Sequence, residues 1–268
     1  MTLTQVVEEY VIVKRSTGLR FRNGAMILRT FARVTGAIEV NDVTQDAVRA
    51  FLKGSGLITS GWHQKHYTLA GLFRFAMQRG LMSTSPVAYR LPKRPAYATP
   101  YIYSEEELRR MLDATSALDR PHPKNGQPAT IPALTFRTLI LLLYGAGLRL
   151  GEALALALED VDLHTNMLLV RNTKFFKTRW VPIGPRLSSA LDLYAGTRLA
   201  VIRRPPTRNA FLLRRDGIPI SLYTAERYFR ILRSRIGLRR SDSAYFQPRL
   251  HDLRHHAGSR LMPGRRVA

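Results

Sequence analysis

The chain has 268 residues, of which 45% are hydrophobic, so it is long enough for two modest domains that each bury a core. Lys and Arg total 42 against 19 Asp and Glu, and the resulting formal charge of +23 makes nucleic acid the first partner to consider. The complete absence of cysteine excludes disulfides, thiolate metal sites and cysteine nucleophiles.

The first part of the chain is predicted to be a bundle of four short helices. Apolar-periodic runs at 4–15 and 25–34 are separated by a turn at 20–24, and a third run follows Asp42. The fourth run is the clearest, because apolar residues from Leu69 to Met77 recur at i, i+3, i+4, i+7 and i+8, and Gly80 suits a C-terminal cap. Three basic residues beside this stripe are candidate contacts to a DNA backbone, although a solvated surface explains each of them equally well: Lys65, Arg74 and Arg79.

A basic, proline-rich linker is expected to separate this bundle from a second domain. Pro92, Pro95 and Pro100 remove amide donors and fix φ, while Lys93 and Arg94 add charge and are further candidate DNA contacts. We therefore expect a helical domain over 1–90, a linker over 91–100 and a second domain over 101–268.

The second domain is predicted to be mainly α with small β elements, an α+β fold. Ser104 and Glu107 form a capping box that opens a helix, and a buried helix is expected from Leu134 to Tyr144. Two strands, 167–170 and 180–183, are expected on either side of a basic turn at 172–177. The remaining predicted elements are a helix over 187–203, a hairpin of strands 210–213 and 218–220 around Asp216-Gly217, a helix over 222–236 and another after His251.

Three arrangements in this domain suit phosphate chemistry. In the first, a glycine-punctuated helix end presents Arg149, and Glu152 follows one helical turn later. The planar guanidinium of an arginine can contact two oxygens of a phosphodiester and stays charged at any pH, and Glu152 could hold its rotamer. A surface Arg–Glu pair on a helix explains the spacing at least as well when it is considered alone.

The second arrangement is the basic turn. Lys174 at its tip could enter a DNA groove or protonate a leaving oxygen, and Lys177 and Arg179 follow closely as candidate DNA contacts. A plain basic hairpin is the alternative.

The third arrangement is His251 and Arg254, which share a helix face three residues apart. They place an imidazole for proton transfer beside a guanidinium clamp. A metal site of His251, His255 and His256 is the weaker reading, because the Glu and third ligand of a zinc-protease helix are missing.

Taken in order, these motifs resemble the tyrosine recombinase or phage integrase family. The resemblance rests on Gly-Leu-Arg-Leu-Gly-Glu-Ala-Leu at 147–154, the lysine turn leading into Trp-Val-Pro-Ile-Gly at 180–184, and His-Asp-Leu-Arg-His at 251–255. It implies an N-terminal core-binding (SAM-like) helical bundle followed by an integrase-type catalytic domain.

The resemblance also implies roles for individual residues. Arg149 and Arg254 match the two arginines that clamp the scissile phosphate, and His251 matches the histidine that assists proton transfer. Lys174 matches the lysine that protonates the departing 5′-hydroxyl better than Lys177 does, although Thr173 and Phe175 stand where the family usually has glycine. Glu152 matches an acidic position that supports the first arginine.

The family nucleophile is a tyrosine, and no tyrosine follows Arg254 in this sequence. The last tyrosine, Tyr245, precedes the histidine motif, and the residues from Met262 to Arg266 break the helical pattern. We therefore expect a chain that stops before the nucleophile position, through a frameshift or a premature stop, and that is catalytically impaired by itself.

The resemblance implies a site-specific recombinase or integrase that binds double-stranded DNA, needs no metal or other cofactor, and acts as a homo-tetramer on paired sites. A tyrosine donated by another protomer and a non-catalytic protein that occupies recombination sites are the alternatives. The chain carries no apolar run long enough to cross a membrane and no signal-peptide core, so we expect a cytoplasmic, nucleoid-associated protein.

Overall fold

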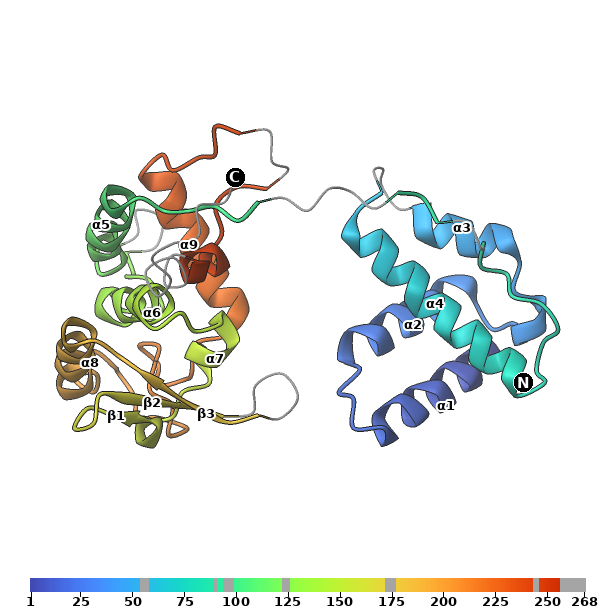
Figure 1. Ribbon diagram of the computed structural model, residues 1–268, viewed down its shortest axis with the longest axis horizontal. Helices are drawn as coiled ribbons and strands as arrows, with labels where there is room; N and C mark the ends of the chain where they lie inside the picture. Colours follow the sequence, from blue (N-terminus) through green and yellow to red (C-terminus); the bar gives the residue numbers. More distant parts are fainter. Residues whose placement is uncertain are drawn as a thin grey trace, which may run out of the picture. The chain divides into compact units, whose positions relative to one another are not determined.

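The computed structural model describes residues 1–53, 58–88, 91–93, 99–121, 126–171, 177–242 and 246–255. The chain divides into two compact units, Met1–Tyr97 and Ala98–Ala268, and the division lies within the stretch 91–100 where the prolines are concentrated. Figure 1 shows the first unit as helices alone and the second as helices with a small sheet.

The first unit contains the four expected helices. They are α1 (Leu3–Ser16), α2 (Arg22–Thr35), α3 (Gln45–Lys53) and α4 (Ser60–Gln78), with a short 3₁₀ turn η1 (Val40–Asp42). Helix α1 begins in a capping box in which Thr2 and Gln5 satisfy each other's backbone amides. Helix α4 ends as predicted: Gly80 adopts φ +69°, and Leu81 N–H donates to Ala76 O while Gly80 N–H donates to Met77 O.

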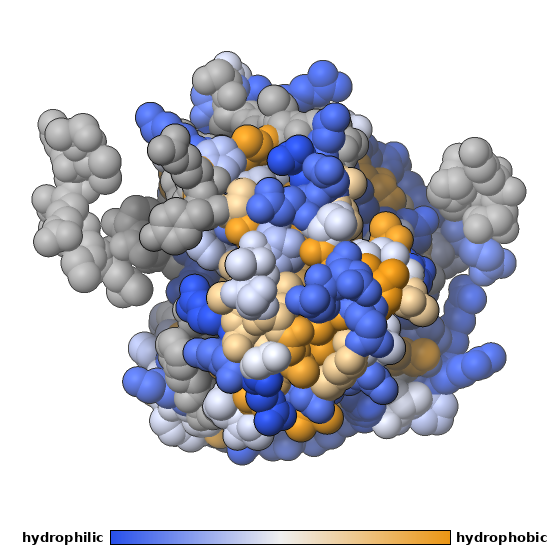
Figure 2. Space-filling model, turned by 90° about the vertical axis from the view of Figure 1, so that its right-hand side faces the viewer, coloured by the Kyte–Doolittle hydropathy of each residue, from blue (hydrophilic) through white to orange (hydrophobic). Residues whose placement is uncertain are grey.

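The core of the first unit is formed by the apolar stripes of its helices. Leu28 and Phe31 of α2 pack with Leu69, Leu72 and Phe73 of α4, and all five are fully buried. Figure 2 views the molecule from the side on which Figure 1 draws this unit, and apolar side chains reach the surface there among hydrophilic ones. The periodicity of the sequence identified the inward face of α4 from Leu69 to Ala76, whereas Met77, the last residue of the predicted stripe, is exposed.

The second unit contains a larger set of helices around a buried one. The longer helices are α5 (Glu105–Ala114), α6 (Ala133–Gly145), α8 (Pro185–Thr197) and α9 (Leu222–Arg235), and α7 (Leu150–Leu154) is a short one. The 3₁₀ turns are η2 (Thr115–Leu118), η3 (Leu158–Asp160) and η5 (Leu250–Asp252). The capping box predicted at Ser104 and Glu107 opens α5.

Helix α6 is apolar around almost its whole circumference because neighbours cover it on several sides. It packs against α7, α8 and η2, and its residues Phe136, Leu139, Ile140, Leu142 and Leu143 are fully buried. This helix is the centre of the core of the second unit, and its C-terminal end leads directly to Arg149.

The sheet is antiparallel, with strand order β1 (Val161–Asp162), β2 (Met167–Val170) and β3 (Arg179–Pro182). Val170 pairs with Arg179 and Met167 with Pro182, which confirms the two strands predicted on either side of the basic turn. This register starts β3 at Arg179, so that residue stands opposite the last residue of β2.

Two local predictions are wrong. The helix expected over 187–203 ends at Thr197, and the chain beyond it bonds elsewhere, since Arg203 N–H donates to Arg215 O rather than to a helical carbonyl. The strands expected at 210–213 and 218–220 do not form as such: the turn at Asp216-Gly217 is closed by the hydrogen bond from Arg214 N–H to Ile218 O, and the pairing goes no further than an isolated bridge between Leu213 and Pro219. Proline has no N–H to extend a ladder, so the pairing stops there.

Candidate functional site

Arg149 is presented by the sharp turn between α6 and α7. Helix α6 ends at Gly145, and Gly147 adopts φ +63°, a left-handed conformation that favours glycine. Leu148 is then buried completely, which fixes the chain, and Arg149 follows as the N-cap residue of α7 with an exposed side chain. The glycine-punctuated motif therefore has a local structural reason.

Glu152 lies between two arginines and binds both. Its Oε2 accepts the Arg149 backbone N–H at 3.0 Å, and its Oε1 accepts from Arg149 Nη1 at 2.7 Å. Arg179 of β3 adds a two-pronged contact, with Nη1 3.2 Å from Oε1 and Nη2 2.8 Å from Oε2. The predicted Arg149–Glu152 contact is therefore present, while Arg179, expected at a DNA surface, lies against this carboxylate.

The electrostatics of Glu152 reflect these contacts. Burial by itself would raise the pKa of Glu152, but the hydrogen bonds from Arg179 and from the backbone and guanidinium of Arg149 outweigh it and lower the pKa to about 2. Glu152 is consequently a fixed negative charge at neutral pH, and only 8% of its side chain is exposed.

Arg254 belongs to the same electrostatic neighbourhood. Burial lowers the pKa of its guanidinium first, the positive charges of Arg149 and Arg179 lower it further, and Glu152 partly offsets them. Arginine nevertheless remains protonated in proteins. Residues 149, 179 and 254, which lie far apart in the sequence, thus bring three cations to one carboxylate, and this region carries an excess of positive charge suited to an anion.

His251 lies one turn before Arg254, next to a second histidine. Its ring is edge-to-face with that of His255, with centroids 5.8 Å apart. Partial burial lowers the pKa of His251, and the positive environment of His255, Arg254 and Arg249 lowers it further against the opposing effect of Asp252. Both effects favour the neutral imidazole, which is the form able to accept a proton.

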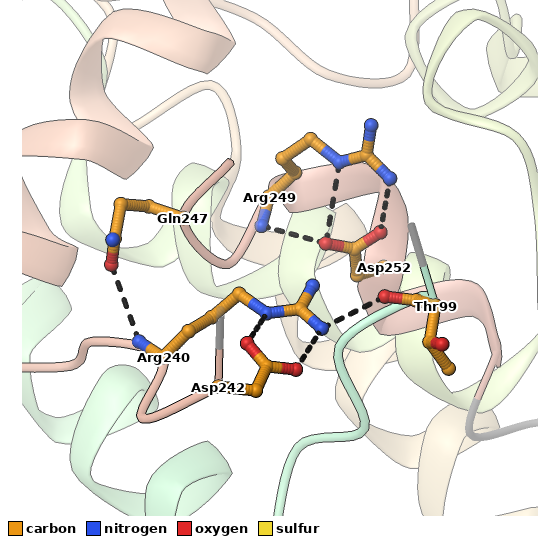
Figure 3. Close-up of polar contacts among 6 residues, drawn as sticks. All are labelled: Thr99, Arg240, Asp242, Gln247, Arg249 and Asp252. Carbon is orange, nitrogen blue, oxygen red and sulfur yellow. Dashed lines mark hydrogen bonds and ion pairs between the residues drawn. The ribbon is translucent and has the colours of Figure 1, made fainter. Parts of the chain in front are cut away.

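The turn that carries His251 and Arg254 is held by a second Arg–carboxylate pair, drawn in Figure 3. The fully buried Asp252 accepts the Arg249 backbone N–H at 2.9 Å, its Nη2 at 2.9 Å and its Nε at 3.3 Å. Arg249 and Asp252 thus repeat the local arrangement of Arg149 and Glu152: the residue that caps the turn bonds a carboxylate three positions later.

Side chains from distant parts of the second unit fix the same turn. Tyr103 donates its hydroxyl to Arg249 O at 2.8 Å, and Arg233 Nη1 of α9 donates to Pro248 O at 2.8 Å. The guanidinium of Arg249 also lies 3.7 Å from the ring centroid of Phe246. The conformation of the turn before Arg254 therefore depends on contacts with residues that lie far away in the sequence, up to 146 positions for Tyr103.

Lys174 and Arg94 lie outside the described residues, so their predicted roles stay predictions. Lys177 and Lys93 are exposed, as a DNA contact requires.

The basic residues predicted on α4 differ in their surroundings. Arg74 is exposed. Arg79 forms an ion pair of 3.3 Å with Glu9, and Lys65 places its ammonium 5.0 Å from the ring centroid of Phe51. Part of the charge on α4 is thus engaged within the unit.

Sequence reasoning missed a basic stripe on α2. The stripe consists of three arginines and one methionine at positions i, i+4, i+7 and i+11 of the helix: Arg22, Met26, Arg29 and Arg33. All four side chains are exposed, and they line a shallow groove together with Arg15. Arg29 is paired with Glu8 through two bonds of 2.7 Å. The helical spacing of these arginines was the available signal.

The residues that the structure describes include no candidate metal site. Among the described residues, no three His, Asp or Glu side chains are grouped so that they could hold a metal ion. The described helices also include none long and apolar enough to cross a membrane.

Comparison with known proteins identifies the family to which these motifs belong. The model of the phage integrase family matches residues 103–264, which cover more than half of the chain and include both arginine motifs.

Two relatives match across nearly the whole chain. A protein of Sinorhizobium fredii with the provisional designation integrase/recombinase y4rB is 30% identical over 255 residues, covering 95% of this chain and 80% of the relative. The tyrosine recombinase XerC of Oceanobacillus iheyensis is 28% identical over 251 residues, covering 90% of this chain and 75% of the relative.

The fold is also that of a solved structure. The chain matches lambda integrase (75–356), a dimer bound to a COC′ core site, with a TM-score of 0.67 and 20% identity, over 96% of this chain and 88% of that one. At that identity the likeness shows the fold alone.

Proposed function

Since the chain belongs to the phage integrase family, we propose that it binds double-stranded DNA as a site-specific recombinase does, with a phosphodiester held by the second unit. The proposal places Arg149 and Arg254 on the phosphate oxygens. It also places the first unit on the DNA backbone as a core-binding domain, and the protein on the nucleoid.

One observation carries the proposal: Arg149, Arg179 and Arg254 share a neighbourhood in which Glu152 is the carboxylate that binds two of them. Three positive charges against one negative charge leave a local excess that a phosphodiester would neutralise. Arg149 is 45% exposed and uses one guanidinium nitrogen for Glu152, so other donors remain for a ligand.

The chemistry that this arrangement supports is phosphoryl transfer to a tyrosine. The tyrosine oxygen would attack phosphorus, forming a 3′-phosphotyrosyl link as the bond to the 5′-oxygen breaks, and the arginines would stabilise the negative charge that develops on the phosphate. We assign the proton for the departing 5′-oxygen to Lys174, and proton transfer at the same phosphate to the neutral imidazole of His251.

The nucleophile is a separate matter from phosphate binding. Residues 255–268 contain no tyrosine, so we expect the 268-residue polypeptide by itself to bind DNA without forming a covalent link. The second candidate function is that of a non-catalytic protein that occupies recombination sites. A tyrosine from another protomer of a tetramer would complete the reaction, and only a mixture with that protomer would then form the link.

A binding experiment tests the proposal. Duplexes selected by the protein from a random-sequence pool would be titrated by fluorescence anisotropy at several salt concentrations. We expect R149Q and R254Q each to weaken binding about 10-fold, which is the lower end of the roughly 1.5–3 kcal/mol that a charge-assisted hydrogen bond contributes. The matched control is R109Q, because Arg109 forms an exposed pair with Glu106 and its loss removes the same charge. Equal affinities of R149Q, R254Q and R109Q would overturn the proposal.

The role of the first unit can be tested in the same assay. If the α2 stripe contacts backbone phosphates, R33Q should lower the slope of log affinity against log salt by about 0.9. An unchanged slope would remove α2 from the proposed interface.

A nicked duplex, in which cleavage traps the protein, tests the expected loss of cleavage. The 268-residue polypeptide should leave no adduct on a denaturing gel, and an adduct formed by this polypeptide alone would contradict the expected loss of cleavage.

A further inference from the structure

Arg179 and Arg149 use the same carboxylate in different ways. Arg179 directs both terminal nitrogens of its guanidinium at Glu152, one to each oxygen, at 3.2 and 2.8 Å. Arg149 directs one guanidinium nitrogen at Oε1, at 2.7 Å. The planar fork of Arg179 is therefore committed to Glu152, whereas Arg149 keeps donors for a further partner.

The contact also joins two elements that the sequence does not place together. Arg149 caps α7, and Arg179 is the first residue of β3, which is held by its antiparallel pairing with β2. Two rigid elements thus converge on Glu152, whose side chain is nearly buried. The position of Glu152, and through it the rotamer of Arg149, is fixed from both sides.

Electrostatics give Arg179 a second effect on the same carboxylate. Burial of Glu152 favours its neutral form, and the hydrogen bond from Arg179 is the largest of the interactions that oppose this. Arg179 therefore helps to keep the nearly buried Glu152 ionised, and its loss would raise the pKa of Glu152 and free the two oxygens from the strand side of the contact.

From this geometry we propose that Arg179 is a positioning residue: it acts on the phosphate through Glu152 and Arg149, and is not itself a contact to DNA. The inference rests on the proposed function, because it requires Arg149 to bind a phosphate. It differs from the expectation, drawn from sequence, that Arg179 lies on the DNA.

A double-mutant cycle on affinity for the selected duplex tests the proposal. Arg179→Gln should weaken binding about 10-fold, as Arg149→Gln does, and the double variant should be at most about 2-fold weaker than either, since residues acting as one unit are not additive. Arg179→Lys should stay weak although it keeps the charge, because an ammonium cannot form the two-pronged contact. Arg109→Gln is the matched control for the loss of one charge and should stay within about 2-fold of the parent.

The outcomes distinguish the two proposals. If the effects of R149Q and R179Q multiply and R179K restores binding, Arg179 contacts DNA directly and the positioning role is wrong. If R149Q binds like the control, the proposed function itself fails. Urea titrations would establish that each variant is folded, and if R179Q is not, the cycle would be run with R179K and the R149Q/R179K double variant, for which the same non-additivity is expected and additivity would refute the role.

Discussion

Replacing Glu152 with glutamine should destabilise the second unit in a way that depends on pH. The change keeps the shape of the side chain, but an amide presents N–H groups where Arg149 and Arg179 require an acceptor. The carboxylate is held as an anion by these arginines, and its pKa is about 2 against an ordinary value of 4.5.

The magnitude follows from that pKa. Each unit corresponds to about 1.4 kcal/mol, so the shift sets a ceiling of roughly 3 kcal/mol on the contribution of the charge to the free energy of unfolding. The two arginines expose 45% and 38% of their side chains, and water screens their charges. We therefore expect E152Q to cost about 1–2 kcal/mol at pH 7.

The direction with pH follows as well. A carboxyl whose pKa is lowered in the folded state stabilises the protein above its ordinary pKa and loses that contribution as the pH falls toward the folded value. The difference between the parent and E152Q should thus be full above about pH 5 and fall to roughly two fifths of that at pH 3.

Urea titrations at several pH values between 7 and 3 measure this difference. The control is E106Q, because Glu106 pairs with Arg109 in an exposed position and its loss should cost at most about 0.5 kcal/mol. A cost for E152Q that is as small as that of E106Q, or one that does not change with pH, would show that the ionised carboxylate of Glu152 does not stabilise the second unit.

Three further predictions concern the turn before Arg254. D252N should cost about 2–3 kcal/mol in a urea titration, because the fully buried Asp252 accepts three bonds from Arg249; a cost below 0.5 kcal/mol would show that the pair does not hold the turn. Y103F removes the hydroxyl that donates to Arg249 O and should cost about 1 kcal/mol in the same titration, and an unchanged midpoint would contradict this. His251 should titrate below 6.5 in histidine NMR spectra, so the neutral imidazole favours folding above that pH and the benefit is lost as the pH falls; a midpoint at or above 6.5 would refute the environment described for it.

The sequence predicted the local parts of this molecule well. Helix α4, the capping box of α5 and the strands around the basic turn each depend on residues that are close together in the sequence, and all three are present in the structure. The predicted end of α8 was wrong for the complementary reason, since the chain beyond Thr197 bonds to a distant segment through Arg203 N–H and Arg215 O.

The candidate site shows the same division. Arg149 and Glu152 are three residues apart, so their contact could be expected from helical spacing. Arg179 could not be assigned to Glu152 from spacing, because the contact depends on the strand register and on how the sheet meets α7. Asp252 read as an ordinary residue of the histidine motif, and only the fold shows it buried beneath Arg249.

Arg149 is proposed to bind one phosphate of a DNA duplex. To test this, the phosphates of a selected duplex are replaced, one at a time, with uncharged methylphosphonate, and the affinities of the parent and R149Q are compared. We predict a position at which neutralisation weakens binding of the parent about 10-fold and binding of R149Q hardly at all, since the guanidinium and the phosphate act as a pair. A profile without such a position, or the same loss at that position in R149Q, would contradict the claim.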